Sequence, residues 1–286
     1  MKVALNFFPV RPAFFYPMVE RMERLRYHAV LLGEHLVFPE RMETAYPYDP
    51  QVGPPLPETP LLDPLITLAT VAARTTRLTI GTSIYILTLR HPIIAARLAA
   101  TLDFLSEGRL WFGVGSGWLK EEFAASQQPW DHRGARLEES VGILRRLWSE
   151  PRVASDGPYY PFDAVAFEPK PVHRQIPIVL GGETRPALAR AARIGDGWTG
   201  VDHTPETAAE RVRQLAELRG DRPPLEISVD VTKLPDRDSL LRFRDAGVTM
   251  VILRNRLFTA QDRSLQGALD NLSRFAELAM HPAGVV

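Results

Sequence analysis

His35 is the first residue of this 286-residue sequence whose type and position suggest a reaction. It ends the apolar run AVLLGEH (residues 29–35), which predicts a buried strand. An imidazole exchanges a proton near neutral pH, so a histidine at a strand end is a candidate acid or base. Taken alone, it is better interpreted as a histidine that satisfies a loop carbonyl. Neighbouring side chains on a strand point to opposite faces, so we expect Glu34 to line a pocket or brace a loop rather than orient His35.

Glycines occupy alternate positions where a second strand-like run, RLWFGVGSGWLKEEF (residues 109–123), should be ending. Gly113, Gly115 and Gly117 can adopt backbone angles that other residues avoid, and they allow a ligand to approach the main chain closely. This spacing predicts a ligand site at the strand end. The same letters also fit a tight turn before a helix.

A third candidate is the segment GGETRPA (residues 181–187). Gly181 and Gly182 allow close approach of a ligand, and Thr184 can cap the helix that follows. Free amides at that helix start, with help from Arg185, could hold a phosphate. A simple strand-to-helix turn has the same appearance.

Eight strand-like runs alternate with helical patterns along the chain. The helical patterns have apolar residues at three-to-four spacing. Strands that are buried on both faces read as continuous apolar runs, so the pattern predicts the α/β class and a single (β/α)8 TIM barrel. A two-domain doubly wound fold is the alternative. The predicted strands cover residues 2–8, 29–35, 77–83, 109–115, 176–182, 196–201, 225–231 and 248–254.

Two long irregular loops interrupt this pattern, after strands 2 and 4. The first, residues 36–60, is rich in proline, and the second covers residues 151–177. Loops of this length in a compact domain are usually functional lids or disordered segments. In a barrel the first would lie at the carboxyl-terminal face, where active sites are built.

Charge and composition exclude several functions. The chain has 34 basic and 34 acidic residues without a basic block, so we expect no nucleic-acid partner. The lack of cysteine excludes disulfides and thiolate metal sites and fits a reducing compartment. No His-x-His or His-Glu-x-x-His motif is present, so no metal is expected. No run reaches the roughly 18 apolar residues of a membrane span, and the N-terminus lacks a cleavage signal, which predicts a cytoplasmic protein.

Five segments keep the order found in one known family. They are EH at 34–35, the stretch from RLTIGTS to WLKEEF at 77–123, RGARLEE at 133–139, PKPV at 169–172 and IVLGGETRPALARAARIGDGW at 178–198. Together they resemble the bacterial-luciferase-like family, particularly its branch that uses the deazaflavin coenzyme F420. The resemblance implies one TIM-barrel domain over residues 1–286, a flavin or deazaflavin across the carboxyl-terminal face, and a homodimer. It implies oxidoreductase chemistry and leaves the small-molecule substrate open.

The resemblance also implies roles for single residues. His35 would lie by the reactive ring as the catalytic proton donor or acceptor, and the Ser83–Ile84 peptide would be cis behind the ring. Trp118 and Glu121 replace a glutamate and an asparagine of the family's sugar-phosphate dehydrogenases, so a sugar substrate is not carried over and an apolar or aromatic one is favoured. The expected cofactor contacts are Glu34, Ser83, Ile84, Gly115, Gly117, Glu121, Gly181, Gly182, Thr184 and Arg185. The expected substrate pocket consists of Phe8, Phe38 and Trp118.

The activity implied by the resemblance is hydride transfer between coenzyme F420 and a small organic substrate. Two alternatives stay open at this point. One is an FMN-dependent monooxygenase, in which reduced flavin reacts with oxygen, and the other is a flavin-binding barrel without catalysis. The acidic tail of F420 would need a partly basic groove at the barrel mouth, for which Arg90 and Arg185 are candidates.

Overall fold

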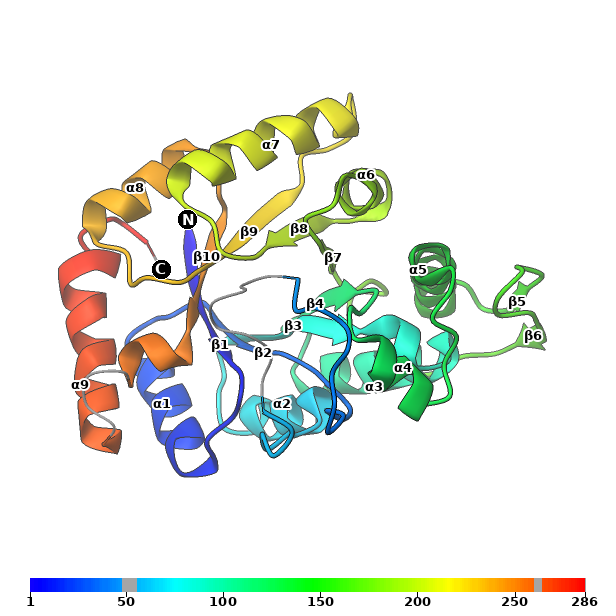
Figure 1. The fold of residues 1–286 in the computed structure, drawn as a ribbon, viewed down its shortest axis with the longest axis horizontal. Coiled ribbons are helices and arrows are strands. Elements are labelled where there is room, and N and C mark those ends of the chain that lie inside the picture. Colours follow the sequence, from blue (N-terminus) through cyan, green and yellow to red (C-terminus); the bar gives the residue numbers. More distant parts are fainter. Residues whose placement is uncertain (48–55, 260–263, 286) are drawn as a thin grey trace.

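Eight parallel strands close into a barrel in the computed structural model, which describes residues 1–47, 56–259 and 264–285 (Figure 1). Hydrogen bonds join the strands in the order β1-β10-β9-β8-β7-β4-β3-β2. This arrangement confirms the predicted (β/α)8 barrel, and the strand ends differ from prediction by only a few residues. The barrel strands are β1 (Lys2–Phe7), β2 (Ala29–Leu32), β3 (Thr79–Ile86), β4 (Leu110–Gly115), β7 (Ile178–Gly181), β8 (Gly197–Gly200), β9 (Glu226–Val231) and β10 (Met250–Arg254).

Helices surround the barrel and alternate with its strands (Figure 1). Several begin at a capping side chain followed by proline, as at Asp63, His91 and Thr204, which fixes where the chain turns back along the barrel. Within the described residues, no helix is both long and apolar enough to cross a membrane. The helices are α1 (Pro12–Arg24), α2 (Pro64–Ala72), α3 (Pro92–Leu105), α4 (Lys120–Ala125), α5 (Arg133–Ser149), α6 (Arg185–Ile194), α7 (Pro205–Arg219), α8 (Arg237–Asp245) and α9 (Leu265–Phe275), with short turns η1 (Leu87–Leu89), η2 (Asn255–Phe258) and η3 (Ala276–Met280).

The inside of the barrel changes from apolar to polar toward the carboxyl ends of its strands. Alternate side chains point inward along each strand. The apolar layer consists of Ala4, Ala29, Leu31, Trp111, Val179, Met250 and Ile252. Two positions further along their strands, Asn6, Gly181 and Arg254 line a cavity instead. The barrel therefore supplies a packed base and a polar floor for a site.

The segment 151–177, which we expected to be irregular, contains an antiparallel hairpin. Its strands are β5 (Val153–Ser155) and β6 (Phe162–Val165), and they lie outside the barrel beyond α5 (Figure 1). Strands of three and four residues are too short to show an alternating pattern, which explains why the sequence did not reveal them. In the loop after β2, residues 36–47 and 56–60 form no helix or strand, and residues 48–55 lie outside the described residues.

Candidate active site

A cavity of about 540 Å³ opens at the carboxyl ends of the barrel strands. Ligand-binding pockets are typically about 300–1,000 Å³ in volume, so a sizeable organic molecule fits here. One wall is aromatic, with Phe8, Tyr46 and Trp118 around His35. Another part of the lining is polar, and its side chains are Arg11, Asp230, Arg254, Asn255 and Arg256.

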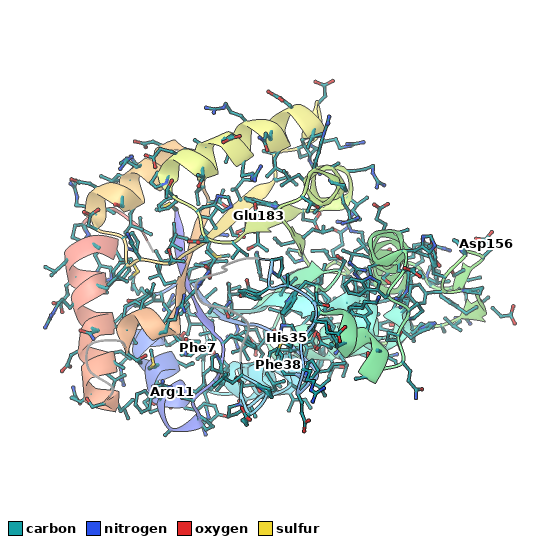
Figure 2. The ribbon with its side chains drawn as sticks, in the orientation of Figure 1. Phe7, Arg11, His35, Phe38, Asp156 and Glu183 are labelled. Carbon is teal, nitrogen blue, oxygen red and sulfur yellow. The ribbon has the colours of Figure 1, made fainter. Side chains whose placement is uncertain are left out.

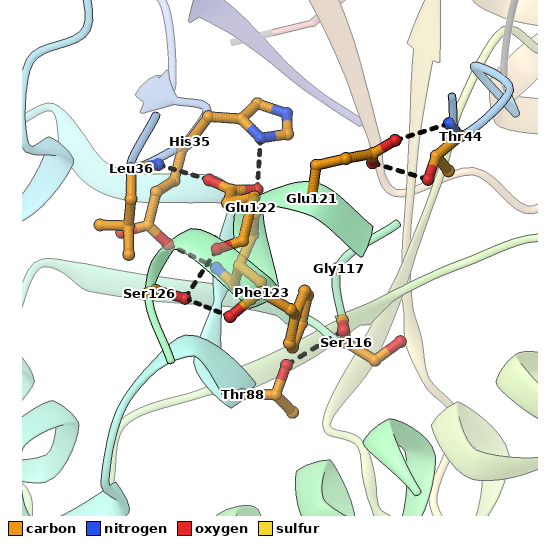
Figure 3. A network of polar contacts seen from close by, with 12 residues as sticks. His35, Leu36, Thr44, Thr88, Ser116, Gly117, Glu121, Glu122, Phe123 and Ser126 are labelled. Atoms are coloured by element: carbon orange, nitrogen blue, oxygen red, sulfur yellow. Dashed lines mark hydrogen bonds and ion pairs between the residues drawn. The ribbon is translucent and has the colours of Figure 1, made fainter. Parts of the chain in front are cut away.

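His35 and Glu122 form a hydrogen-bonded pair at the edge of this cavity (Figure 3). Nδ1 of His35 lies 2.8 Å from Oε2 of Glu122, whose side chain is fully buried. The other oxygen, Oε1, accepts the backbone N–H of Leu36 at 2.5 Å. An ionised carboxylate can only accept hydrogen bonds, so the Nδ1 of a neutral His35 carries the proton. Nε2 then offers a lone pair on the cavity side, as in a base oriented by a second group.

Glu121 points away from His35, although it precedes Glu122 directly (Figure 3). Its carboxylate accepts the backbone N–H of Glu43 at 2.7 Å and both the N–H and the hydroxyl of Thr44, at 2.9 and 2.7 Å. Burial acts to raise its pKa, but these hydrogen bonds outweigh burial and lower the pKa of Glu121 to about 2. The expectation that Glu121 contacts the cofactor is therefore corrected: it fastens the loop after β2 to α4.

Glu34 lines the cavity, one of the two roles expected for it, and it also braces the end of β3. Its Oε2 accepts the N–H of Ile86 at 2.6 Å, and Oε1 accepts from Arg90 at 2.6 Å. Burial raises the pKa of the Glu34 carboxyl, and the Arg90 guanidinium acts in the opposite direction. Arg90 is thus committed to Glu34 and to the ring of Tyr85, over which its guanidinium lies at 4.1 Å. It is not among the residues that line the cavity, so it does not supply the expected basic groove.

The peptide bond between Ser83 and Ile84 is cis, as the resemblance implied. Both residues line the cavity, on the strand that lies beside β2 and His35. The Ser83 carbonyl oxygen accepts a hydrogen bond from the side-chain amide of Asn6 at 3.1 Å. This contact links β1 to β3 across the floor of the cavity.

The glycines of β4 make room for β3 rather than for a ligand. A Cβ atom at Gly113 would overlap the carbonyl oxygen of Thr82, and one at Gly115 would overlap Cδ1 of Ile84. Gly115 therefore supports the cavity from behind, which corrects the expectation of a direct cofactor contact. Gly117, by contrast, lines the cavity as expected.

Only part of the GGETRPA segment reaches the cavity. Gly181 and Gly182 line it, and Gly182 has a φ of +131°, a backbone conformation that favours glycine. Thr184 caps α6 through the N–H of Ala187, and Arg185 is exposed. Neither is among the lining residues, so the structure does not place them at the cofactor contacts expected from the sequence.

Three aromatic side chains lie close to His35. Its ring centroid lies 6.0 Å from that of Phe8, 4.6 Å from that of Phe38 and 5.6 Å from that of Trp118. Figure 2 shows His35 and Phe38 together at this end of the barrel. Phe8 and Trp118 line the cavity as expected, whereas Phe38 packs on His35 and is not among the lining residues. Tyr46, from the loop after β2, adds a further ring 5.2 Å from Trp118.

Sequence reasoning missed the ion pair between Asp230 and Arg254. Nε and Nη2 of Arg254 lie 2.7 and 2.6 Å from Oδ1 of Asp230. Burial raises the pKa of Asp230 to about 6, against the lowering effect of Arg254. A signal was present, because each residue stands at the carboxyl end of an apolar strand, where barrel enzymes place functional groups. Within the described residues, no three His, Cys, Asp or Glu side chains are grouped to hold a metal ion.

Comparisons with known proteins identify the family of the chain and agree with its fold. An uncharacterised protein of Mycobacterium tuberculosis (strain ATCC 25618 / H37Rv) is 30% identical over 271 residues, which cover 92% of this chain and 93% of that protein. The F420-dependent glucose-6-phosphate dehydrogenase of Kribbella flavida is 31% identical over 226 residues, 75% of this chain and 59% of that enzyme. The structure of an F420-dependent secondary alcohol dehydrogenase with an F420–acetone adduct superposes with a TM-score of 0.76 at 17% identity and covers 99% of this chain and 98% of the other. Residues 10–272 match the family described as luciferase-like monooxygenase, and the chain belongs to this family.

Proposed function

We propose that the protein transfers a hydride between coenzyme F420 and a small organic substrate, and that His35 moves the accompanying proton. The observation that carries this proposal is the His35–Glu122 pair, with Nδ1 and Oε2 2.8 Å apart at the edge of the cavity. A substrate that loses a hydride from carbon must also lose a proton, and the reverse reaction must supply one. Nε2 of His35 is the group that would accept or give it.

The residues of the cavity fit a flat ring. Gly117, Gly181 and Gly182 contribute no side chain to its lining, and Ser83 and Ile84 form the wall at β3. Coenzyme F420, when bound, would supply the hydride acceptor or donor at C5 of its ring. These five residues would hold the ring. Backbone amides near Gly182, at the start of α6, would favour its phosphate.

Other residues would shield and position the substrate. Phe8 and Trp118 both lie close to His35 and would exclude water from the proton-transfer position. Glu122 holds the imidazole in one tautomer. Glu121 ties the loop after β2 to α4 next to this pair and so helps to close the aromatic wall.

Support for F420 comes from the relatives, among which a glucose-6-phosphate dehydrogenase and a structurally similar alcohol dehydrogenase are named as F420-dependent. The family is described as luciferase-like monooxygenases, which supports an FMN-dependent monooxygenase as the second candidate. A flavin-binding barrel without catalysis is disfavoured by the intact His35–Glu122 pair.

Turnover assays distinguish these three activities. Without oxygen, protein loaded with oxidised F420 is mixed with a panel of alcohols, and protein loaded with reduced F420 is mixed with aldehydes and unsaturated ketones. The oxidised ring is followed by its absorbance in both assays. Hydride transfer in either direction that is lost in His35→Ala supports the proposal. Substrate oxygenation only with reduced FMN and oxygen would favour the monooxygenase, and cofactor binding without any turnover would favour the non-catalytic barrel.

We further propose a homodimer that forms through the outer face of α2 and α3. On α3, Ile94, Leu98 and Leu105 follow helical spacing along one exposed face. Ile66 on the neighbouring α2 and Phe104 extend this apolar surface. Exposed apolar patches on soluble proteins commonly mark interaction sites, and a second copy that presents the same face would cover this one.

We also propose that residues 1–286 act as one domain in the cytoplasm. Helices α8 and α9 pack with η3 and α1, which joins the C-terminal part of the chain to the first strand–helix unit. The absence of cysteine from the sequence is consistent with a reducing compartment.

A further inference from the structure

Arg254 is held rigidly in the cavity but is only half satisfied. Its Nε and Nη2 share one oxygen, Oδ1 of Asp230, on the adjacent strand β9. Among the described residues, Nη1 of Arg254 and Oδ2 of Asp230 have no hydrogen-bond partner in the protein. The Arg254 side chain is 21% exposed and the Asp230 side chain 9%, so both face the cavity rather than bulk solvent. A fixed guanidinium with a free edge is suited to recognise an oxyanion in two-point geometry.

Two more arginines stand on the same side of the cavity. Arg256 follows β10 in η2, and Arg11 precedes α1, so both lie near the carboxyl ends of β10 and β1. Neither forms an ion pair with a carboxylate in the part of the chain that the structure describes. Among the described residues that line the cavity, Asp230 is the one carboxylate on this side. The other, Glu34, lies at β2–β3 and is bound to Arg90. We call Arg11, Arg254 and Arg256 the arginine arc; it carries an excess of positive charge.

The strand order places the arginine arc away from the residues assigned to the cofactor. Around the closed barrel, β10 and β9 stand across from β4 and β3, and β1 stands across from β7. Ser83 and Ile84 belong to β3, and Gly181 ends β7. A ring held by these residues leaves the space between it and the arginine arc for the substrate. The same space is bordered by Phe8 and Trp118.

From these contacts we propose that the arginine arc, centred on Arg254, binds the oxyanion of an aromatic substrate, such as a carboxylate, sulfonate or phosphate group. This inference rests on the proposed function, because that assigns the opposite wall to the cofactor. The aromatic part of the substrate lies against Phe8 and Trp118, close to His35. The oxyanion pairs with the free edge of Arg254.

Asp230 and the oxyanion compete for Arg254. Binding of the oxyanion is therefore linked to protonation of Asp230. The charged groups that face Asp230 are Arg254 on β10, Arg256 in η2 and Asp202 after β8. Burial and Asp202 raise the pKa of Asp230, which reaches about 6 although both arginines lower it. An oxyanion next to Arg254 repels the ionised carboxylate, so protonation of Asp230 favours binding. Affinity for the oxyanion therefore rises as pH falls through about 6.

Calorimetric titration with two matched probes tests this site. Benzenesulfonate stays ionised over the whole pH range used, and benzenesulfonamide has nearly the same shape without the charge. In F420-saturated protein at about pH 5.5, we expect the sulfonate to bind roughly tenfold or more tightly than the sulfonamide, the usual scale for a charge-assisted hydrogen bond. Arg254→Gln should abolish this preference, and Arg254→Lys should keep part of it. Arg213→Gln, which removes an exposed charge on α7, should leave it unchanged.

The pH dependence separates Asp230 from His35, the other titratable group near the probe. The preference should fall several-fold between about pH 5.5 and about pH 7.5 in the wild type and in His35→Gln. In Asp230→Asn it should stay high at both pH values. Equal binding of the two probes in the wild type, or a preference that survives Arg254→Gln, would overturn the proposal. A pH dependence that disappears only in His35→Gln would also overturn it.

The phosphate of the cofactor is the other oxyanion that could occupy the arc. Binding of F420 is therefore compared with binding of the deazaflavin that lacks the phosphate-bearing tail. Equal affinities of wild type and Arg254→Gln for both rings support a substrate site. A loss of affinity in Arg254→Gln that is confined to F420 would assign the arginine arc to the cofactor tail and overturn the substrate assignment. If F420 does not bind at all, the proposed function fails, and the sulfonate titration of the cofactor-free protein still decides whether the oxyanion site exists.

Discussion

Nδ1 of His35 lies 2.8 Å from Oε2 of Glu122, although the two residues are 87 positions apart in the sequence. The same carboxylate accepts the N–H of Leu36, so Glu122 fixes both the imidazole and the backbone that carries it. A buried carboxylate with two such partners orients the histidine before any ligand arrives. The reactive nitrogen is then Nε2, on the side of the cavity.

We expect His35→Ala to lower turnover roughly 100-fold or more, because the positioned proton donor or acceptor is lost. Glu122→Gln should cost roughly 10- to 100-fold, as is common when a group that orients a histidine is removed. The specific readout is the tautomer of His35 in ¹⁵N-edited NMR spectra. The wild type should carry the proton on Nδ1, and Glu122→Gln should lose this preference.

Glu121→Gln is the matched control for Glu122→Gln, because it changes the adjacent carboxylate on the same helix. It should loosen the contact with Thr44 and leave the His35 tautomer as in the wild type. If both substitutions changed the tautomer equally, or neither did, Glu122 would not be the group that orients His35.

Glycine-to-alanine substitutions should have opposite effects on stability at two sites. At Gly113 the added Cβ would overlap the backbone carbonyl of Thr82, so we expect a loss of about 1–3 kcal/mol or more in the free energy of unfolding. At Gly142, on the exposed face of α5, a Cβ meets no atom within 4 Å, and alanine should add about 1 kcal/mol. Urea unfolding measures both. A stable Gly113→Ala variant would contradict the packing described for β3 and β4.

Asp230 should make the folded protein less stable as pH rises from about 4 to about 6. Its pKa is raised from 3.8 to about 6 by burial, so the folded state binds the proton more tightly than the unfolded state in this window. The contribution of Asp230 to the free energy of unfolding is fully present below pH 3.8, and it is lost as the pH rises through about 6. The free-energy difference between Asp230→Asn and the wild type should therefore grow by up to about 3 kcal/mol across the window. A difference that is constant with pH, measured by denaturant unfolding, would contradict the raised pKa.

The homodimer is tested by a charge placed on the exposed face of α3. Leu98 is 38% exposed and lies between Ile94 and Leu105 on that face. Leu98→Glu should convert the dimer to a monomer in light scattering after gel filtration, because a buried unpaired carboxylate is costly in an interface. Leu218→Glu, at a comparable exposure of 39% on α7, is the control and should stay dimeric. A wild type that is monomeric at all concentrations would rule out this interface.

The barrel could be predicted from the sequence because its strands are buried on both faces and read as continuous apolar runs. The place of His35 at the cavity could be predicted because it stands at the end of such a run, whereas its catalytic role stays a prediction that rests on the family resemblance. The role of Glu122 could not, because Glu121 and Glu122 are equivalent in the sequence and only the placement of α4 decides which one faces His35. The hairpin β5–β6 was missed because its strands are too short to show a period.

The pairing of Asp230 with Arg254 could not be predicted from the sequence either, for a different reason. Each is visible as a charge at the end of a buried strand, but their pairing depends on β9 and β10 being neighbours with a particular register. The sequence also could not show the role of the β4 glycines, because a glycine needed for strand packing looks the same as one that lets a ligand approach. Gly115 proved to be the first kind, since its missing Cβ makes room for Ile84.

Titration of F420 and FMN into the protein, followed by ring fluorescence at low and high salt, tests the central claim most directly. Exposed Arg185 and the free backbone amides at the start of α6 provide positive potential near Gly182 at the cavity, and salt screens such charges. We predict tighter binding of F420 than of FMN, with a preference that shrinks as salt rises. Tighter binding of FMN under both conditions would contradict the F420-dependent reaction and favour the monooxygenase.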